Sequence, residues 1–312
     1  DNVADDKYRI VVVRGGRVVA EWNHGLGRED RLWLYSATKS IFSCMLGIII
    51  GDDTIPSADA KVVDYYPEAM DVPPGEGPKP GRFAFEKDRD ITFRQLISNT
   101  SGYMKPGEEP GKVFHYQTYG MNILTHAIAK MYGLYDISKP ESSPGLKELI
   151  EKKLAAPIGA DWDYYVTNFD LHAQARIDIF GYYDGVQSNA LDMARLGWLW
   201  CNWGNWDGTQ VVPEEWLLQA TQTAPTIRMN CPRDQWRYGY GFWTNDHLQL
   251  WPKLPRGSYL ASGLGNQYIW VCPRFDLVVA ESPGLRNRRD EDFDKLLQLV
   301  LGACVGGVRK RP

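Results

Sequence analysis

The chain has 312 residues, of which 44% are hydrophobic and 24% are charged, and its formal net charge is −4. This composition is typical of a globular protein with one large domain or two closely packed ones. The acidic balance argues against nucleic-acid binding, because the one basic cluster, Arg309 to Arg311, lies at the end of the chain.

The first predicted element is a β-hairpin. Residues Tyr8 to Val13 and Arg17 to Trp22 are rich in β-branched side chains, and Gly15-Gly16 separates them. A buried helix is expected next, because Ile41 to Ile50 is apolar on nearly all sides and Gly51-Asp52-Asp53 provides a stop. This run is too short to span a membrane, which takes about 20 residues.

The sequence Ser36-Ala37-Thr38-Lys39 opens this helix and places a hydroxyl and an amine three residues apart. Side chains at this spacing share one helix face. A serine becomes a nucleophile when a neighbouring base takes its proton, and the free N–H groups at a helix N-terminus favour a developing oxyanion. Lysine normally titrates near ~10.4, so a base that works near pH 7 needs a pKa about three units lower, mainly through burial. An N-capping serine beside a surface lysine is the alternative.

A loop-rich region follows from about residue 52 to 110, with a short helix expected over Ile91 to Ser98. Helices are predicted over Met121 to Met131, Gly145 to Leu154, Leu191 to Trp203 and Glu214 to Thr221. Strand patterns return at Tyr238 to Asn245, Gln267 to Cys272 and Leu277 to Glu281, before a last helix from about Asp290 to Leu301. This order predicts an α/β (α+β) fold. Residues 1–50 and 236–312 would form an antiparallel sheet domain, and residues 51–235 a mainly helical insertion.

The cysteines and histidines indicate neither a disulfide framework nor a metal site. The five cysteines are scattered, without a Cys-x-x-Cys pair, and Cys44 is expected to be a buried helix residue. The five histidines lack metal-ligand spacing, so neither a metal nor an organic cofactor is expected. The chain starts at Asp1, which leaves the compartment open: cytoplasmic, or periplasmic or secreted after removal of a leader. The oligomeric state is left open as well.

From Ile10 to about Ser282 the chain resembles the serine β-lactamase and penicillin-binding-protein superfamily, most closely its class C-like esterase, D-aminopeptidase and 6-aminohexanoate-dimer hydrolase branch. The likeness rests on the order of several segments. They are the hairpin Val11–Glu21, the nucleophile motif Tyr35–Ser40, Leu96–Gly102 (similar to "LLTHTSG"), the helix-opening turn Gly185–Ala194, Val212–Trp216 and Tyr238–Trp243. The resemblance implies a β-lactamase-like fold, an antiparallel sheet flanked by helices, and an acyl-enzyme mechanism on Ser36 with Lys39.

The family's second motif is Tyr-x-Asn, whose tyrosine takes part in proton transfer. Its counterpart here is Tyr116-Gln117-Thr118, followed by Gly120 and apolar helix positions. Tyr119 and Tyr103 are rival candidates. Thr118 departs from the usual asparagine and lacks its amide, although its hydroxyl could still bind substrate. A phenol near ~10 needs a cationic neighbour to act as a base, and Lys39 would be one.

The family's third motif lies on a strand that faces the nucleophile. Ala261-Ser262-Gly263-Leu264 resembles the "ATGHGGQ" version of the hydrolase branch. The resemblance makes the N–H groups of Ser36 and Leu264 the oxyanion donors, with Ser262 and Gly263 beside the substrate. Ala261 stands where β-lactamases carry lysine, and Arg286 could substitute as a carboxylate anchor. Trp243 and Trp270 are expected to line an apolar acyl pocket.

The sequence therefore predicts a serine hydrolase of the carboxylesterase or amidase type, with a small ester or amide as substrate. One alternative is a β-lactamase or D,D-peptidase on the same fold, which the missing lysine disfavours. Another is a sensor or binding module that is acylated without turnover. A catalytically inactive scaffold is the third, and the intact set of Ser36, Lys39 and Tyr116 speaks against it.

Overall fold

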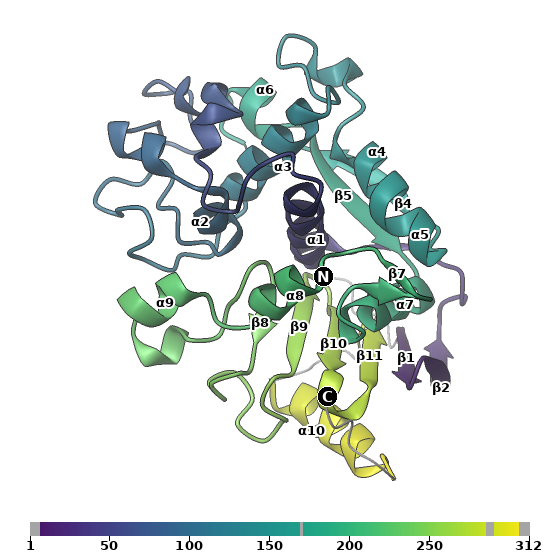
Figure 1. The fold of residues 1–312 in the computed structure, drawn as a ribbon. Helices are drawn as coiled ribbons and strands as arrows, with labels where there is room; N and C mark the ends of the chain where they lie inside the picture. Colours follow the sequence, from purple (N-terminus) through teal and green to yellow (C-terminus); the bar gives the residue numbers. More distant parts are fainter. Residues whose placement is uncertain (1–6, 169–170, 285–289, 306–312) are drawn as a thin grey trace.

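The largest sheet of the protein is built from both ends of the chain. The structure, a computed structural model, describes residues 7–168, 171–284 and 290–305. Six antiparallel strands lie in the order β2-β1-β11-β10-β9-β8 (Figure 1). They are β1 (Tyr8–Arg14), β2 (Arg17–His24), β8 (Trp243–Thr244), β9 (Tyr259–Gly263), β10 (Gln267–Cys272) and β11 (Leu277–Glu281). The predicted antiparallel sheet is therefore confirmed.

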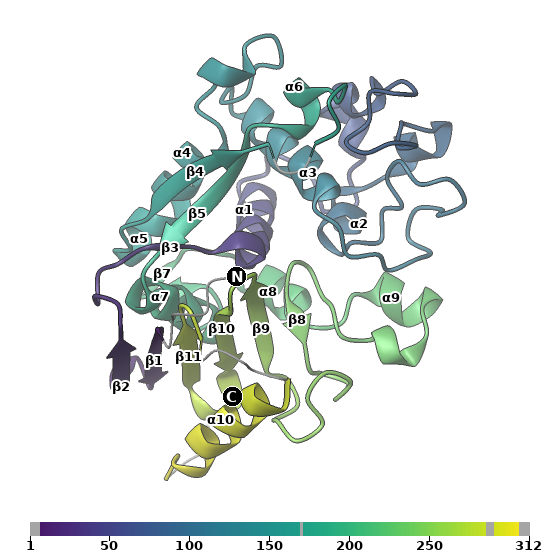
Figure 2. The same cartoon turned by 180° about the vertical axis from the view of Figure 1, so that it is seen from behind.

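Two helices cover opposite faces of this sheet (Figures 1 and 2). Helix α7 (Ala190–Cys201) packs so closely that a Cβ on Gly197 would lie 2.4 Å from a methyl group of Val278. Helix α10 (Asp290–Gly302) contributes Leu297 to a second apolar cluster on the other face, together with Trp270. Because α7 belongs by sequence to residues 51–235 but packs on the sheet, the division into two domains stays a hypothesis.

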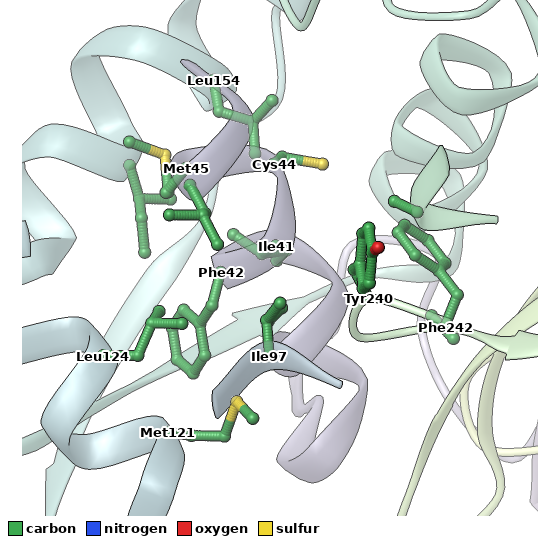
Figure 3. Close-up of a cluster of buried hydrophobic side chains, with 14 of the residues drawn as sticks. Ile41, Phe42, Cys44, Met45, Ile97, Met121, Leu124, Leu154, Tyr240 and Phe242 are labelled. Atoms are coloured by element: carbon green, nitrogen blue, oxygen red, sulfur yellow. The ribbon is translucent and has the colours of Figure 1, made fainter. Parts of the chain in front are cut away.

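Helix α1 (Thr38–Gly51) runs through the main core and is buried over its first 12 residues, Thr38 to Ile49. Figure 3 shows apolar side chains on several sides of it, among them Leu124, Ile97 and Phe242. These partners come from α2 (Phe93–Ile97), α3 (Tyr119–Met131) and the turn before β8, and α8 (Glu214–Ala220) also packs on α1. The prediction of an interior helix is confirmed, and its burial fixes the position of the chain that enters it.

The remaining elements differ from the sequence prediction, because strands lie inside the region expected to be helical. A three-stranded antiparallel sheet has the order β3-β5-β4. The strands are β3 (Leu32–Trp33), β4 (Asp163–Thr167) and β5 (Tyr183–Ser188), with a small hairpin of β6 (Asn205–Trp206) and β7 (Thr209–Gln210). Gly185 to Ser188, expected as a turn, belong to β5, and Asn189 caps α7 by accepting the N–H of Asp192. The prediction of a turn is wrong because Val186 pairs with Tyr164 across the two strands.

The other helices are short: α4 (Leu146–Ile150, continued by a π turn over Glu151–Ala155), α5 (Ala156–Ile158), α6 (Ile177–Phe180) and α9 (Pro225–Asn230). None of the helices in the described parts of the chain combines the length and apolar character that crossing a membrane requires.

The predicted strand over Tyr238 to Asn245 is mostly wrong, since only Trp243–Thr244 forms β8. Gly239 lies against the backbone of α8: a Cβ at this position would lie 2.1 Å from the carbonyl oxygen of Ala220. Gly241 has φ +80° and donates its N–H to the carbonyl of Ile97. These contacts make the segment a tight turn against α2 and α8, which a pattern of alternating aromatic residues does not reveal.

A buried arginine ties the strand β1 to two loops. Arg9 is fully buried, and its guanidinium donates to the carbonyls of Ser282 (2.6 Å), Gly27 (3.2 Å) and Asp30 and to the Ser282 hydroxyl (3.2 Å). Burial lowers the pKa of Arg9, and the nearby Asp30 opposes this effect. Removing the guanidinium would leave several buried oxygens without a donor.

We therefore expect Arg9→Met to lower the free energy of unfolding by about 2–4 kcal/mol, because each charge-assisted hydrogen bond contributes about 1.5–3 kcal/mol. Urea unfolding followed by far-UV circular dichroism measures this change. Arg17→Met, at an exposed position of the same hairpin, is the matched control and should change stability by less than about 0.5 kcal/mol. Equal losses in the two variants would contradict this assignment.

Candidate active site

Ser36 lies on a short 3₁₀ turn, Tyr35–Ala37, that leads directly into α1. The expectation that Ser36 begins the α-helix itself is wrong by two residues, because α1 starts at Thr38. Tyr35 has φ +48°, a left-handed conformation that is uncommon for a residue with a side chain. The tight turn holds Ser36 half-buried at the mouth of the interior helix. Such strain is typical of functional sites.

Lys39 is only 2% exposed, and its Nζ lies 2.7 Å from the Oγ of Ser36. Desolvation by burial lowers the pKa of Lys39 to about 7. The amine is therefore neutral in a large fraction of molecules near pH 7, and a neutral amine can accept the serine proton. The burial that the sequence hypothesis requires of Lys39 is present.

Tyr116 is the predicted tyrosine that reaches this pair. Its hydroxyl hydrogen-bonds the side chain of Ser36, and its ring centre lies 5.0 Å from the Nζ of Lys39. Burial raises the pKa of Tyr116, and the bond to Ser36 only partly offsets this effect. The expectation that Lys39 makes Tyr116 a base is therefore not met, since the phenol stays protonated at neutral pH. This chemistry suits a proton donor or relay better than a base.

The two rival tyrosines have other surroundings. The hydroxyl of Tyr103 donates to the carbonyl of Ala69 at 2.6 Å, and the ring of Tyr119 packs edge-on against Phe180. Thr118 is half-buried at the start of α3, where its carbonyl accepts the N–H groups of Met121 and Asn122. A substrate contact of Thr118 stays a prediction.

Asn99 holds the segment that carries Tyr116, a role that the sequence analysis missed. Its Oδ1 accepts the N–H of Gln117 at 2.9 Å, and its carbonyl accepts the N–H of His115 at 2.9 Å. Its Nδ2 donates to the hydroxyl of Tyr238 at 3.3 Å. Asn99 also has φ +56°, which asparagine tolerates better than most residues. The sequence signal that could have indicated this role of Asn99 is the Asn99-Thr100-Ser101-Gly102 segment, which ends the short helix before Tyr116.

Replacing Asn99 with glycine should lower kcat on an ester substrate about 10-fold, which corresponds to about 1.4 kcal/mol of transition-state stabilisation. Glycine keeps the left-handed backbone but removes both side-chain hydrogen bonds, so Tyr116 loses its support. Steady-state kinetics measures the change. Asp276→Gly, at another left-handed residue (φ +49°) in the turn between β10 and β11, should leave kcat unchanged. An unaltered kcat in Asn99→Gly would exclude the proposed support.

The end of β9 touches the turn that carries the nucleophile. A Cβ on Gly263 would lie 2.0 Å from the carbonyl of Leu34 and 3.1 Å from the backbone nitrogen of Ala37, so only glycine fits there. Ser262 is half-buried one residue earlier, and Leu264 begins the following turn with its side chain 73% exposed. The third motif therefore lies beside Ser36. The oxyanion role of the Leu264 N–H stays a prediction.

A buried polar network supports this turn from behind. The hydroxyl of Ser282, held by Arg9, donates to the Oε1 of Gln267 at 2.7 Å, and the Nε2 of Gln267 lies 3.4 Å from the carbonyl of Gly265. The N–H of Gly284 donates to the carbonyl of Asn266 at 2.7 Å. These contacts connect β1, the end of β11 and the β9–β10 turn, and they restrict how that turn can move.

The predicted tryptophans separate into two roles. Trp243 is half-buried and stacks on Tyr116 with ring centres 5.4 Å apart, so it supports the site directly. Trp270 is fully buried in the cluster beneath α10. The expectation that Trp270 lines a substrate pocket is therefore wrong: its β10 neighbours Ile269 and Val271 face the main core, and Trp270 points to the opposite face of the sheet. Arg286 lies outside the described residues.

No cluster of three His, Cys, Asp or Glu side chains with the arrangement of a metal site occurs within residues 7–168, 171–284 and 290–305. Cys44 is buried in α1, as predicted, and receives a hydrogen bond from the indole of Trp200.

Comparison with solved structures defines the class of fold. A family VIII carboxylesterase superposes with a TM-score of 0.65 at 17% identity, covering 91% of this chain and 88% of that chain. An octameric penicillin-binding protein homologue from Pyrococcus abyssi gives a TM-score of 0.64 at 17% identity, covering 95% and 74% of the two chains. At these identities the likeness establishes a β-lactamase-like fold, and the predicted fold class is confirmed.

The sequence comparison then gives the family. The chain belongs to the Beta-lactamase family, whose sequence model matches residues 8–292. The 6-aminohexanoate-dimer hydrolase of Paenarthrobacter ureafaciens is 23% identical over 307 residues, covering 87% of this chain and 71% of that protein. The resemblance drawn from the sequence motifs is confirmed. Family membership defines the fold and a hydrolase lineage, and leaves the substrate to be argued from the site.

Proposed function

We propose that the protein is a serine hydrolase that forms an acyl-enzyme on a small ester or amide. The observation that carries this proposal is the 2.7 Å contact between Ser36 Oγ and Lys39 Nζ, with the pKa of Lys39 lowered to about 7 by burial. A surface lysine beside a capping serine, the alternative interpretation of the motif, would be charged and hydrated. The relatives support a hydrolase, since one is named a carboxylesterase and another a 6-aminohexanoate-dimer hydrolase.

In the proposed first step, neutral Lys39 accepts the hydroxyl proton while Ser36 Oγ bonds to the substrate carbonyl carbon. The carbonyl oxygen becomes an oxyanion, and the N–H groups of Ser36 and Leu264 donate to it. Loss of one such donor typically lowers the rate ~10²–10³-fold. As the tetrahedral centre collapses, the bond to the leaving group breaks. The proton moves from Lys39 through the hydroxyl of Tyr116 to the departing oxygen or nitrogen, which leaves an acyl group on Ser36.

The second step reverses these roles with water as the nucleophile. Water donates a proton to the Lys39–Tyr116 pair as its oxygen attacks the acyl carbon, and Ser36 Oγ recovers a proton when the carboxylic acid leaves. The raised pKa of Tyr116 and the lowered pKa of Lys39 favour lysine as the base and tyrosine as the relay. Strongly coupled groups titrate as a unit, so both steps depend on the pair.

A β-lactamase or D,D-peptidase activity is the second candidate, and the third motif disfavours it. Ala261, where β-lactamases of the resembled superfamily carry lysine, is fully buried in β9. A β-lactam or D-Ala-D-Ala carboxylate would lack this cation. Steady turnover of penicillin at a rate above that of simple esters would support this candidate instead.

The proposal is tested by intact-mass spectrometry after treatment with a fluorophosphonate. The parent protein should gain one phosphonyl group with loss of fluoride, and Ser36→Ala should gain none. With p-nitrophenyl acetate, the parent should release p-nitrophenol continuously, and Ser36→Ala should not exceed the background rate. Equal esterase rates for parent and Ser36→Ala would exclude Ser36 as the nucleophile. A trapped acetyl-protein without continuous turnover would instead support the sensor alternative.

A further inference from the structure

A pair of stacked aromatic rings, one exposed and one half-buried, lies on the three-stranded sheet. Trp33 of β3 and Tyr165 of β4 are parallel within 10°, with ring centres 4.3 Å apart, although the strand β5 runs between them. Gly185 of β5 makes this possible. It pairs with Tyr165, and a Cβ at its position would lie 2.0 Å from the Tyr165 ring. The absent side chain lets one ring cross the middle strand and reach the other.

Tyr35 extends this pair toward the nucleophile. Its ring centre lies 5.7 Å from that of Trp33, and its backbone hydrogen-bonds the hydroxyl of Tyr165. Trp33 is 45% exposed and Tyr35 is 38% exposed, although both are large aromatic side chains. We call Trp33, Tyr35 and Tyr165 the aromatic platform. Exposed aromatic residues gathered in one place mark a binding surface more often than scattered ones do.

The aromatic platform is continuous with the candidate active site. Tyr35 directly precedes Ser36, and the three residues of chain from Trp33 to Ser36 span at most ~10 Å. Tyr183 of β5 packs edge-on against Phe42 of α1 with ring centres 5.4 Å apart, so the sheet that carries the platform packs on the helix that follows Ser36. In Figure 2 the strands β3 and β5 and the chain entering α1 face the viewer, with α4 and α5 behind the sheet.

We propose that the aromatic platform binds a flat ring carried by the substrate, so that the preferred substrates are aryl-bearing, uncharged esters or amides. This inference rests on the proposed function and narrows its substrate class. Flat aromatic faces stack on rings more favourably than on flexible alkyl chains. Arg31, two residues before Trp33, contacts the carboxylates of both Asp161 and Asp163. This guanidinium is therefore already engaged by two anions and is poorly placed to bind an anionic substrate group.

The test compares esters that differ only in the ring. One series keeps a methanol leaving group and compares the methyl ester of 4-phenylbutyrate with that of hexanoate. The other keeps an acetyl group and compares the 2-phenylethyl with the hexyl alcohol. The parent should prefer the aryl member of at least one series in kcat/KM, and the series that shows the preference identifies the part of the substrate that stacks. Trp33→Ala should reduce this preference about 10-fold, the equivalent of one aromatic contact of about 1.4 kcal/mol.

Two further variants make the result specific. Trp33→Phe keeps a ring at the position and should restore most of the preference. Trp22→Ala removes a tryptophan that is 47% exposed on β2 of the other sheet, and should leave the preference unchanged. Because Trp33 is nearly half exposed, its truncation should leave the fold intact, and circular dichroism checks this.

The inference is overturned if the parent hydrolyses esters through Ser36 without an aryl preference, or if Trp33→Ala leaves that preference intact. It is also overturned if Trp33→Ala changes the oligomeric mass in solution and not the preference, since the platform would then be an interface between copies. Undiminished hydrolysis by Ser36→Ala is a different result, because it contradicts the proposed nucleophile and not the platform alone.

Discussion

Replacing Lys39 with methionine is expected to lower kcat by about 10²–10⁴-fold, the usual contribution of a general base, and at the same time to stabilise the fold. The two effects have one cause. Burial lowers the pKa of Lys39 from 10.5 to about 7, and a shift of that size corresponds to about 5 kcal/mol of unfavourable burial of the charged amine. Methionine has a similar shape and no charge, so it removes this cost.

The net gain at pH 7 should be about 2–4 kcal/mol, because methionine also loses the hydrogen bond to Ser36. Between pH 7 and 10.5 the unfolded chain binds more protons at Lys39 than the folded chain does, so parent stability rises with pH across this window. Below pH 7 both states are protonated and the full cost is present. The advantage of Lys39→Met should therefore be largest below pH 7 and disappear above pH 10.5.

Urea unfolding at several pH values measures this difference. Lys87→Met is the matched control, since the Lys87 side chain is only 15% exposed but its Nζ contacts the buried carboxylate of Asp88 at 2.7 Å. That variant leaves the carboxylate of Asp88 without its lysine partner and should be less stable than the parent. If Lys39→Met lost stability as Lys87→Met does, the buried amine of Lys39 would have to be a charged, paired group, contrary to the mechanism.

The pH dependence of kcat/KM is expected to show a single acid limb centred near pH 7, the pKa of Lys39. The rate requires the neutral amine, so kcat/KM should fall about tenfold for each unit below pH 7. Above pH 7 it should reach a plateau, because burial raises the pKa of Tyr116 and keeps the relay protonated. A profile measured on an uncharged ester, whose own ionisation does not change, gives this curve directly.

Tyr116→Phe serves as the control for that profile. It should lower kcat/KM but keep the acid limb near pH 7, since the lysine still controls the ionisation. An acid limb that vanished in Tyr116→Phe would assign the titration to tyrosine instead. An acid limb near pH 4–5 in the parent would indicate a carboxylate base and contradict the assigned roles.

Short sequence patterns predicted those elements of the fold that depend mainly on contacts between residues close together in the chain. The Gly15-Gly16 hairpin, the apolar helix after Ser36 and strands β10 and β11 all appear within a few residues of their expected positions. In each, side-chain periodicity and turn residues agree with the tertiary environment. The order of the motifs from Val11 to Trp243 also predicted the fold class, and family membership confirms that prediction.

The sequence failed where long-range contacts decide the outcome. Strand β5 exists because Val186 pairs with Tyr164 and Leu32 pairs with Ser188, partners far away in the chain. Its Gly185 indicates a turn in isolation but accommodates the ring of Tyr165 in the fold. Trp270 lies near the third motif in sequence, which suggests a pocket position, yet alternation along β10 places its side chain on the opposite face of the sheet.

The candidate site shows the same limit. Ser36, Lys39 and Tyr116 could be named from spacing and resemblance, and the structure brings their side chains together. The contribution of Asn99 could not be predicted from the sequence, because its hydrogen bonds to Gln117 and Tyr238 join three segments that are far apart along the chain. The aromatic platform likewise depends on a pairing of strands that no local pattern indicates.

The proposed catalysis depends on Lys39 being held as a neutral amine against Ser36, and the titration of Lys39 measures this state directly. Protein labelled with ¹³C at the lysine ε-carbon gives one NMR signal for each ordered lysine, and Lys39→Met identifies the signal of Lys39 by its loss. We expect a midpoint near pH 7 for that signal, well apart from lysines that titrate near ~10.4. A Lys39 signal that titrates above pH 10 would show a charged amine at neutral pH and would contradict the proposed catalysis.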